Sequence, residues 1–196
     1  MKQQIIDLIN REVIPAIGCT EPIAVALCTA KAAELLGTKP EKIELFLSGN
    51  IIKNAMGVGI PNTGMTGLPI AVALGAVAGK SEYELEVLKD ADTAAVEQAK
   101  SYLESADIKI DIDRQTQQML YIRAEVFAGE DCAVAVIEGT HTNFTLVSRN
   151  GNALLNAEAV ESGNTTEDQQ PTLTLAQVYE YATTVPLEQI EWLSEA

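Results

Sequence analysis

Apolar residues recur at helical spacing through the first thirteen positions of the chain. The side chains that carry this pattern are Ile5, Ile6, Leu8, Ile9 and Val13. The period predicts an amphipathic helix over residues 2–13, which Pro15 ends. A second helix is predicted from Thr20, as its N-cap, to Gly37, as its C-cap. Threonine suits a helix start, and glycine is common just past a helix end.

A long uncharged segment follows the short strand predicted at Ile43–Leu47. Residues 54–79 carry no charge over 26 positions and include six glycines and two prolines. Their longest apolar run, Leu68–Ala78, is shorter than the ~18 residues that a membrane span needs. We therefore predict a buried loop over Ser48–Gly67 that leads into a buried helix over Leu68–Ala78, closed by Gly79. Buried loops are uncommon unless they form a site, because their backbone groups need partners.

The pattern then changes from helical to alternating. Residues 82–104 predict one or two acidic amphipathic helices with a break near Asp90–Asp92. The isoleucines that follow alternate with charged residues, which is typical of a half-buried strand; they are Ile108, Ile110 and Ile112. Further strands are predicted at Leu120–Phe127, Cys132–Ile137, Phe144–Val147 and Ala153–Ala157. Asn150-Gly151 predicts a tight hairpin turn, because both residues tolerate a positive φ.

These elements predict an α+β fold, in which a helical segment with a buried glycine-rich loop is followed by an antiparallel β-meander packed with helices. The lobe is expected over residues 1–160, with helices at about 2–104 and the meander at about 107–158. The polar residues 161–171 are typical of a linker. Residues 172–196 predict the start of a helical region that continues beyond this chain. Its apolar face needs a cover, which either a partner or further chain would supply.

Composition and charge exclude several classes of protein. A hydrophobic content of 47% with 21% charged residues is that of a folded chain. The formal net charge of −15 excludes nucleic acid and an anionic membrane surface as expected partners, because both require clustered Lys and Arg. Asp7, Asn10 and Arg11 interrupt any apolar signal region. Three cysteines at irregular spacing then indicate free thiols or metal ligands in a cytoplasmic protein.

Cys19 is the strongest candidate for chemistry. It directly precedes a predicted helix start, where free backbone N–H groups and the helix dipole stabilise a thiolate. The alternative is a small buried cysteine with a structural role. Cys28 lies roughly 12 Å further along the same helix, too far to share a cluster with Cys19. Cys132 alternates with Val134 and Val136 on a predicted strand, and we expect it in the core.

The second candidate segment begins at Ser48 and includes three closely spaced glycines. Gly57, Gly59 and Gly64 permit close approach of the backbone to a small anion. Their spacing does not match the dinucleotide fingerprint, and no Gly-Lys-Ser/Thr follows. Lys53 is the only cation near this apolar region. It could bind a carboxylate, act as a base with a lowered pKa, or be an ordinary surface lysine.

Four segments taken together resemble the L-cysteine desulfidase family. They are Pro15–Pro22 (PAIGCTEP), Ser48–Met56, Gly57–Gly64 (GVGIPNTG) and His141–Asn143 (HTN). The same segments resemble the uncharacterised bacterial relatives of that family, which are related to the α part of iron–sulfur L-serine dehydratases. The resemblance runs across essentially the whole chain. His141, the only histidine, lies in a predicted hairpin turn and indicates no catalytic triad by itself.

The resemblance implies a β-eliminating lyase that converts L-cysteine or L-serine to pyruvate and ammonium, with release of sulfide or water. It also implies an oxygen-sensitive [4Fe–4S] cluster held by three cysteines, with one open iron that acts as a Lewis acid. By motif, Cys19 resembles the first cluster ligand, and Lys53 is a candidate base or carboxylate binder. The residues implied in substrate binding are Thr20, Glu21, Ser48, Gly49, Asn50, Asn54, Gly57, Gly59, Asn62, Thr63, Gly64, His141 and Asn143.

Two departures from the family pattern limit what this chain is expected to do. Members of the L-cysteine desulfidase family are longer than this chain. They carry their other cluster cysteines in a C-terminal half that is missing here. Met65 and Thr66 stand where serine dehydratases have a further ligand cysteine in the glycine loop. We therefore expect this chain alone to hold no intact cluster and to be inactive. Its expected partners are a small amino-acid substrate and the missing C-terminal half, and a homo-oligomer stays open.

Two alternative interpretations stay open beside the lyase. One is a cofactor-free or nucleotide-dependent enzyme that uses the glycine loop for phosphate, which tight nucleotide binding would favour. The other is a non-catalytic binding or regulatory module that senses a small amino acid. Cysteine and serine cannot be separated as substrates here, because one loop sequence does not distinguish a thiol from a hydroxyl leaving group.

Overall fold

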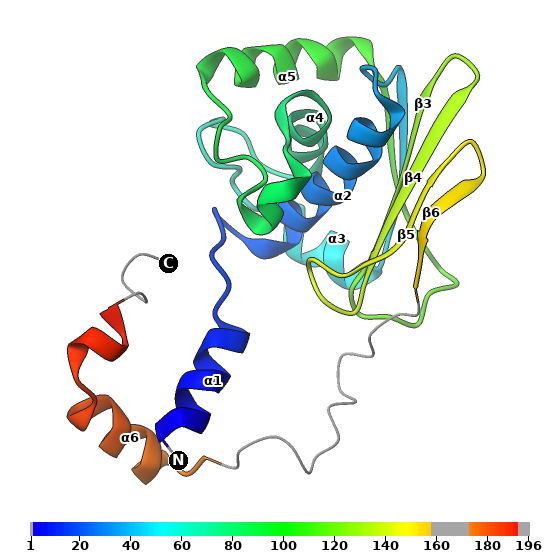
Figure 1. The fold of residues 1–196 in the computed structure, drawn as a ribbon. Helices are drawn as coiled ribbons and strands as arrows, with labels where there is room; N and C mark the ends of the chain where they lie inside the picture. The colour runs from blue at the N-terminus through cyan, green and yellow to red at the C-terminus, as the bar shows by residue number, and fades with distance from the viewer. Residues whose placement is uncertain (1, 158–172, 192–196) are drawn as a thin grey trace. The chain divides into compact units, whose positions relative to one another are not determined.

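A computed structural model gives the fold and describes residues 2–157 and 173–191 (Figure 1). The chain forms two compact units. The larger unit comprises residues 17–162, and the smaller comprises residues 1–16 together with residues 163–196. The candidate residues of the sequence all fall in the larger unit.

The larger unit contains helices close to the predicted positions. They are α2 (Thr20–Leu36), α3 (Gly49–Ala55), α4 (Leu68–Ala78), the 3₁₀ helix η1 (Ser81–Glu86) and α5 (Thr93–Ser105). α4 has the predicted bounds, and Gly37 ends α2 in the left-handed conformation at φ 78°. The predicted break in the acidic segment is confirmed, because the Asp92 side chain caps α5 by accepting from the Ala95 N–H.

Two local predictions about these helices are wrong. The N-cap of α2 is Cys19, whose backbone is extended at φ −73° and ψ 133°, whereas Thr20 is already helical. The Thr20 hydroxyl donates to the Glu21 carboxylate instead of capping the helix. The segment after Ser48 is not all loop, because α3 forms there. The Ser48 side chain accepts from the Ile51 N–H and so supplies a helix start that the glycines around it obscured.

The strands form one mixed six-stranded sheet in the order β2-β1-β3-β4-β5-β6. Their bounds are β1 (Lys42–Leu47), β2 (Asp107–Ile112), β3 (Tyr121–Ala128), β4 (Asp131–Glu138), β5 (Phe144–Arg149) and β6 (Asn152–Asn156). From β1 to β6 through β3 every neighbouring pair is antiparallel, and the predicted hairpin turn has φ 50° at Asn150 and φ 79° at Gly151. The α+β prediction is confirmed.

β2 does not belong to the antiparallel meander. It pairs in parallel with β1, from Lys42 opposite Asp107 to Leu47 opposite Ile112. Because parallel neighbours need a long connection, the helices between β1 and β2 serve as the crossover. β2 is an edge strand, and Ile112 is 46% exposed, so the half-buried pattern of the isoleucines holds for Ile108 and Ile110 only.

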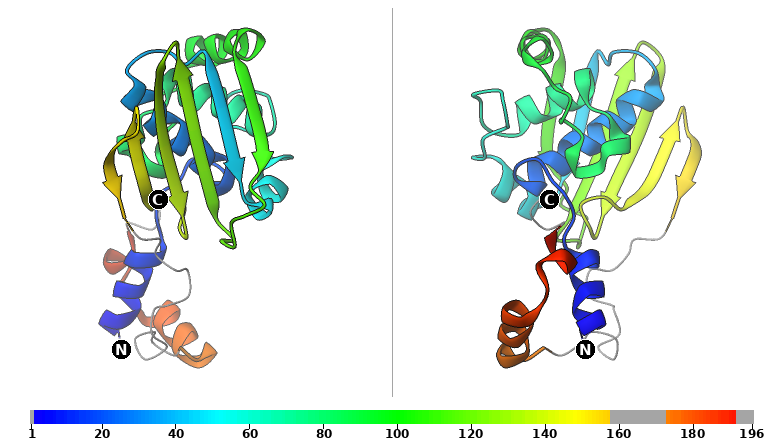
Figure 2. Two further views of the ribbon diagram at one scale, coloured as in Figure 1. Left: turned by 90° about the vertical axis from the view of Figure 1, so that its right-hand side faces the viewer. Right: turned by 60° about the vertical axis from the view of Figure 1, so that its left-hand side comes forward.

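The larger unit has two layers, with the helices on one face of the sheet (Figure 2). Alternate residues of three neighbouring strands are buried on that face. They are Ile43, Leu45 and Leu47 of β1, Ile122, Ala124 and Val126 of β3, and Ala133, Ala135 and Ile137 of β4. α2 packs on this face, and α4 packs on α2. A β-carbon on Gly75 of α4 would lie 2.4 Å from the Ala26 carbonyl oxygen of α2, so the two backbones are in direct contact.

The smaller unit contains α1 (Lys2–Glu12), α6 (Leu175–Thr184) and a 3₁₀ turn at Leu187–Gln189. α6 begins with a capping box: Thr174 Oγ1 accepts from the Gln177 N–H, and the Gln177 side chain accepts from the Thr174 N–H. The structure groups α1 with the C-terminal residues, whereas the sequence placed it in a lobe over residues 1–160. The linker predicted at 161–171 lies outside the described residues.

No helix within residues 2–157 and 173–191 is both long enough and apolar enough to cross a membrane. This agrees with the assignment of the uncharged residues 54–79 to a loop and a buried helix.

Candidate functional site

Glu21, in the first turn of α2, accepts hydrogen bonds from three neighbouring side chains. The Cys19 thiol and the Thr20 hydroxyl donate to Glu21 Oε2, at 3.1 Å and 3.2 Å. The Asn54 amide, near the end of α3, donates to Glu21 Oε1 at 3.2 Å. The two segments singled out from the sequence therefore meet at one carboxylate.

Gly18 brings the glycine loop, defined here as residues 56–67, to the same place. The φ of Gly18 is 89°, a conformation that side chains rarely adopt. A β-carbon on Gly18 would lie 3.0 Å from Cγ of Pro61 in the glycine loop. The absence of a side chain at Gly18 therefore lets the Cys19 turn and the loop approach closely.

The electrostatics of Cys19 and Glu21 are opposite to those of a preformed thiolate. Burial raises the pKa of the Cys19 thiol, and its hydrogen bond to Glu21 raises that pKa further. The hydrogen bond from Cys19 is also the main cause that lowers the pKa of the Glu21 carboxyl, with further lowering by Asn54 and Thr20. The carboxylate is thus charged and the thiol protonated at neutral pH. A metal ion at Cys19 would have to displace that proton.

The glycine loop is a short ordered hairpin, so the prediction of a buried loop is wrong. Gly59 and Thr66 form an isolated antiparallel bridge, and the Ile60 N–H donates to the Met65 carbonyl at 3.0 Å. The backbone groups of the loop therefore find partners within the loop and do not require burial. Met56 is 66% exposed and Met65 is 37% exposed. The lack of charge in this segment therefore does not mark it as buried.

Two of the predicted substrate residues use their hydroxyls to hold the local backbone. Ser48 Oγ donates to the Met119 carbonyl at 2.7 Å and caps α3, and Ser48 is 3% exposed. Thr63 Oγ1 donates to the Ile60 carbonyl at 2.8 Å and accepts from the Met65 N–H at 2.9 Å. These two side chains hold the backbone of the site in place, and because both are buried they present little surface to a ligand.

The other predicted residues of this region reach the surface. Lys53 of α3 is exposed and has no ion pair or hydrogen bond with any residue that the structure describes. Of the predicted substrate residues here, five are exposed, namely Gly49, Gly57, Gly59, Asn62 and Gly64, and three besides Glu21 are partly exposed, namely Thr20, Asn50 and Asn54. The amide of Asn54 is the one among them that the structure brings to Glu21.

The turn between β4 and β5 adds His141 to the surroundings of Glu21. Burial lowers the pKa of the His141 imidazole, and the Glu21 carboxylate acts in the opposite direction. His141 is thus partly buried and within electrostatic reach of Glu21. Asn143 holds this turn in place, because its side-chain amide donates to the Glu138 carbonyl at 3.0 Å and its N–H donates to the Thr140 carbonyl.

The other two cysteines do not join Cys19. Cys28 is fully buried, its thiol donates to the Ala135 carbonyl at 3.2 Å, and burial raises its pKa to about 12. The prediction that Cys132 lies in the core is wrong, because the neighbouring Ala133 is buried in the helix-covered face while Cys132 is partly exposed. Both faces of β4 carry small apolar residues, so alternation alone did not identify the inner face.

A [4Fe–4S] cluster does not fit the described residues by themselves. Such a cluster needs several cysteine thiolates, and only Cys19 lies at this site. Within residues 2–157 and 173–191, no group of three or more His, Cys, Asp or Glu side chains could hold a metal ion. The thiol and carboxylate of this chain can therefore supply only part of a metal centre.

Pro61 lies in a segment that the sequence singled out, but it was not among the predicted site residues. Its role depends on contact with Gly18, 43 positions earlier, and no local pattern reports such a contact. The central position of Glu21 was also missed, although Glu21 was among the predicted substrate residues. The signal for it was weak, since an acidic residue in a first helical turn is common.

The fold and the site together define a two-layer α+β domain with a thiol–carboxylate pair at a helix start. Along almost its whole length the chain is similar to bacterial proteins named UPF0597. It is 54% identical over 195 residues to the one from Phocaeicola vulgatus and 55% identical over 194 residues to one from Bacteroides fragilis strain YCH46, which covers 99% of this chain in each case. It is 42% identical over 196 residues to the one from Yersinia enterocolitica, covering 97% of this chain.

The chain spans less than half the length of these relatives, 45% of the Phocaeicola and Bacteroides proteins and 44% of the Yersinia protein. Their printed names state no activity. No protein-family model matches the chain, and no solved structure matches it. The chain is therefore homologous to part of these bacterial proteins, and their names assign no chemistry to it.

Proposed function

We propose that this chain is the N-terminal part of an iron–sulfur-dependent lyase that removes the β-substituent of L-cysteine or L-serine. The observation that carries the proposal is the convergence of Cys19, Glu21 and Asn54 beside Pro61 of the glycine loop. The products would be pyruvate and ammonium, with sulfide from cysteine or water from serine. The resemblance of the same segments to L-cysteine desulfidases supports this assignment.

The glycine loop has free space beside its backbone, where a small ligand could lie. A β-carbon on Gly57 or Gly59 would meet nothing within 4 Å, and neither residue has a positive φ. Neither packing nor backbone strain within the described chain therefore requires glycine at these positions. A small ligand that approaches the backbone closely would require it, since its atoms would occupy the space of the side chain.

Each polar residue of the site has a distinct proposed task. Before a cluster binds, Glu21 accepts hydrogen bonds from the Cys19 thiol and the Asn54 amide, so that both keep a defined orientation. Asn54 keeps a second N–H for a substrate carboxylate, because its amide carries two donors and only one bond to Glu21 is formed. Lys53, on the same helix and exposed, is proposed as a carboxylate binder or a base.

The cluster itself is assigned to the longer protein. Because the described residues offer one thiol at the site, the remaining ligands would come from residues outside this chain. The proposal accordingly includes inactivity of the chain alone. The length of the UPF0597 relatives is consistent with this division, since more than half of each lies outside the matched region.

The test compares this chain with the longer Phocaeicola vulgatus relative, each reconstituted anaerobically with iron and sulfide. The readouts are iron per polypeptide and pyruvate released from L-cysteine and from L-serine. We expect a cluster and turnover in the relative and neither in this chain. An intact cluster in this chain alone would contradict the division of ligands. Amino-acid binding by the relative without turnover would favour the non-catalytic sensing module.

A further inference from the structure

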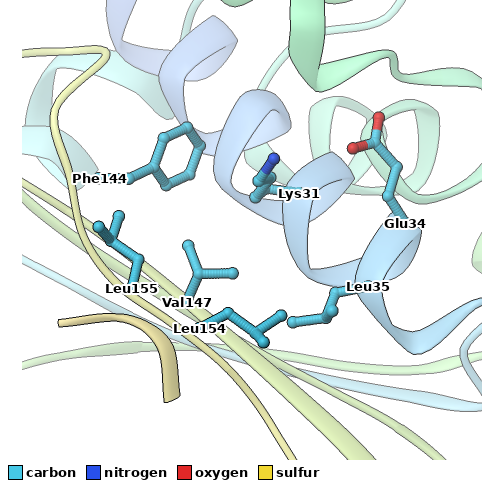
Figure 3. Close-up of a pocket in the computed structure, with 7 residues that line it drawn as sticks. All are labelled: Lys31, Glu34, Leu35, Phe144, Val147, Leu154 and Leu155. Carbon is cyan, nitrogen blue, oxygen red and sulfur yellow. The ribbon is translucent and has the colours of Figure 1, made fainter.

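A groove lies between the C-terminal half of α2 and the β5–β6 hairpin, at the end of the sheet away from β2 (Figure 3). Its volume of about 540 Å³ is within the range of small-molecule sites. The residues that line it are Lys31, Glu34 and Leu35 of α2, Phe144 and Val147 of β5, and Leu154 and Leu155 of β6. Five of these seven side chains are apolar.

The groove is separate from the candidate functional site. Lys31 lies twelve positions after Cys19 on α2, which corresponds to about 18 Å along the helix. No residue that lines the groove contacts Cys19 or Glu21 through a hydrogen bond in the described chain. An inference about the groove is therefore independent of the proposed lyase.

The polar end of the groove presents one available cation. Lys31 is partly buried and has no ion pair or hydrogen bond with any described residue. Glu34 also lines the groove and keeps its charge, but it forms no ion pair with Lys31; its carboxylate is held by the Ser81 N–H at 2.7 Å and by the Ser81 hydroxyl. In Figure 3 that carboxylate points away from the leucine and valine side chains. Arg149 is likewise engaged, by the Leu35 carbonyl and Asp131.

The apolar end of the groove is exposed to a degree unusual for leucine. Leu154 is 70% exposed and Leu155 is 38% exposed, and both line the groove. In Figure 3 these two side chains, Val147 and Leu35 face one another across the groove, with Phe144 beside Lys31. An aliphatic chain laid between them would cover apolar surface and leave its end group at Lys31.

We propose that this groove binds an aliphatic carboxylate of about six to ten carbons, with its tail between Leu35, Leu154 and Leu155 and its carboxylate on Lys31. A cationic amphiphile is disfavoured, because Lys31 would repel it. An uncharged lipid would desolvate Lys31 without giving it a partner. A phosphate ligand would lack further cationic donors, since Lys31 is the only cation among the described residues that line the groove.

The test is calorimetric titration of the chain with hexanoate, octanoate and decanoate at millimolar concentrations. We expect saturable binding that tightens about fourfold per methylene, the value for removing a methylene from water. Lys31→Gln should weaken octanoate binding by about tenfold or more, because a charge-assisted hydrogen bond is lost, while leaving the weaker binding of 1-octanol unchanged.

The matched control is Lys100→Gln, which changes the net charge equally. Lys100 pairs with Glu97 on the surface of α5 and does not line the groove, so octanoate affinity should not change. Leu154→Asp tests the apolar end of the groove. Because Leu154 is 70% exposed, the variant should keep its fold, and circular dichroism checks this. Absence of saturable binding, or equal weakening by Lys31→Gln and Lys100→Gln, would overturn the proposal.

Discussion

In the contact between α2 and α4, a β-carbon on Gly75 would lie 2.4 Å from the Ala26 carbonyl oxygen, and one on Gly79 would lie 2.7 Å from the Ala30 β-carbon. In the glycine loop, by contrast, a β-carbon on Gly57 meets nothing within 4 Å. Gly57, Gly75 and Gly79 all belong to the same uncharged stretch of sequence. Packing requires glycine at Gly75 and Gly79, whereas neither packing nor a positive φ within the described chain requires it at Gly57.

The same contrast separates the two cysteines of α2. Cys28 is fully buried and its thiol bonds to backbone carbonyls of the sheet, so its surroundings are complete. Cys19 is partly exposed at the helix start and bonds to the Glu21 carboxylate. Structure within the chain explains Cys28 and Gly75. It gives no such reason for Gly57 or for a partly exposed thiol at Cys19, which the proposed function assigns to a ligand site.

The largest expected effect concerns the thiols. With a pKa of about 12, Cys28 holds on the order of a thousandfold less thiolate at pH 8 than an ordinary cysteine, and burial blocks access besides. Iodoacetamide should therefore label Cys28 only after unfolding, while Cys19 and Cys132 react in the folded chain. Peptide mass spectrometry over time measures the three rates. Labelling of Cys28 as fast as Cys132 would show that α2 is not packed on the sheet.

Gly75→Ala should destabilise the fold by about 1–3 kcal/mol, because the new methyl group forces α2 and α4 apart. The gain in helix propensity, up to about 1 kcal/mol, offsets part of this cost. Urea unfolding followed by circular dichroism gives the difference from the midpoint and slope. A variant as stable as the parent would contradict the direct backbone contact.

Ser48→Ala should cost about 1 kcal/mol, since it removes the N-cap of α3 and the hydrogen bond to the Met119 carbonyl. The matched control is Ser101→Ala in α5, where an exposed serine has no capping role and alanine favours the helix. The difference between the two variants in urea unfolding isolates the cap. Equal stability would mean that α3 does not depend on Ser48.

The smallest expected effect on stability belongs to Gly57→Ala. With free space around the new methyl group and no positive φ to forbid it, the free energy of unfolding should change by less than about 0.5 kcal/mol, or rise slightly. The same urea experiment measures it beside Gly75→Ala. A loss as large as that of Gly75→Ala would remove the contrast between packed and open glycines, and with it the case for a ligand at the loop.

Local patterns predicted the elements whose cause is local. The bounds of α4 follow from an apolar run between glycines, and the turn at Asn150-Gly151 follows from residues that accept a positive φ. Features that depend on distant residues were missed. The parallel pairing of β2 with β1 joins residues more than sixty positions apart, and β2 shows the same alternation that an antiparallel strand would.

In the candidate site, too, local features were predicted and contacts between distant residues were missed. The Cys19 turn and the glycine loop could each be singled out by composition, but their meeting depends on Asn54 reaching Glu21 and on Pro61 against Gly18. The exposure of the loop also escaped prediction, because lack of charge does not distinguish a buried segment from an apolar surface. The sequence predicted a thiolate at Cys19 and missed its raised pKa, because that pKa depends on burial and on the hydrogen bond to Glu21.

The most direct test of the central claim joins this chain to the unmatched part of the Phocaeicola vulgatus relative, in place of the 54% identical segment. After anaerobic reconstitution, pyruvate release from L-cysteine and L-serine is measured for the parent, Cys19→Ser and Cys132→Ser. The account predicts turnover in the parent and in Cys132→Ser, and loss of both turnover and cluster absorbance in Cys19→Ser. Unchanged turnover in Cys19→Ser, or no pyruvate from either substrate, would contradict it.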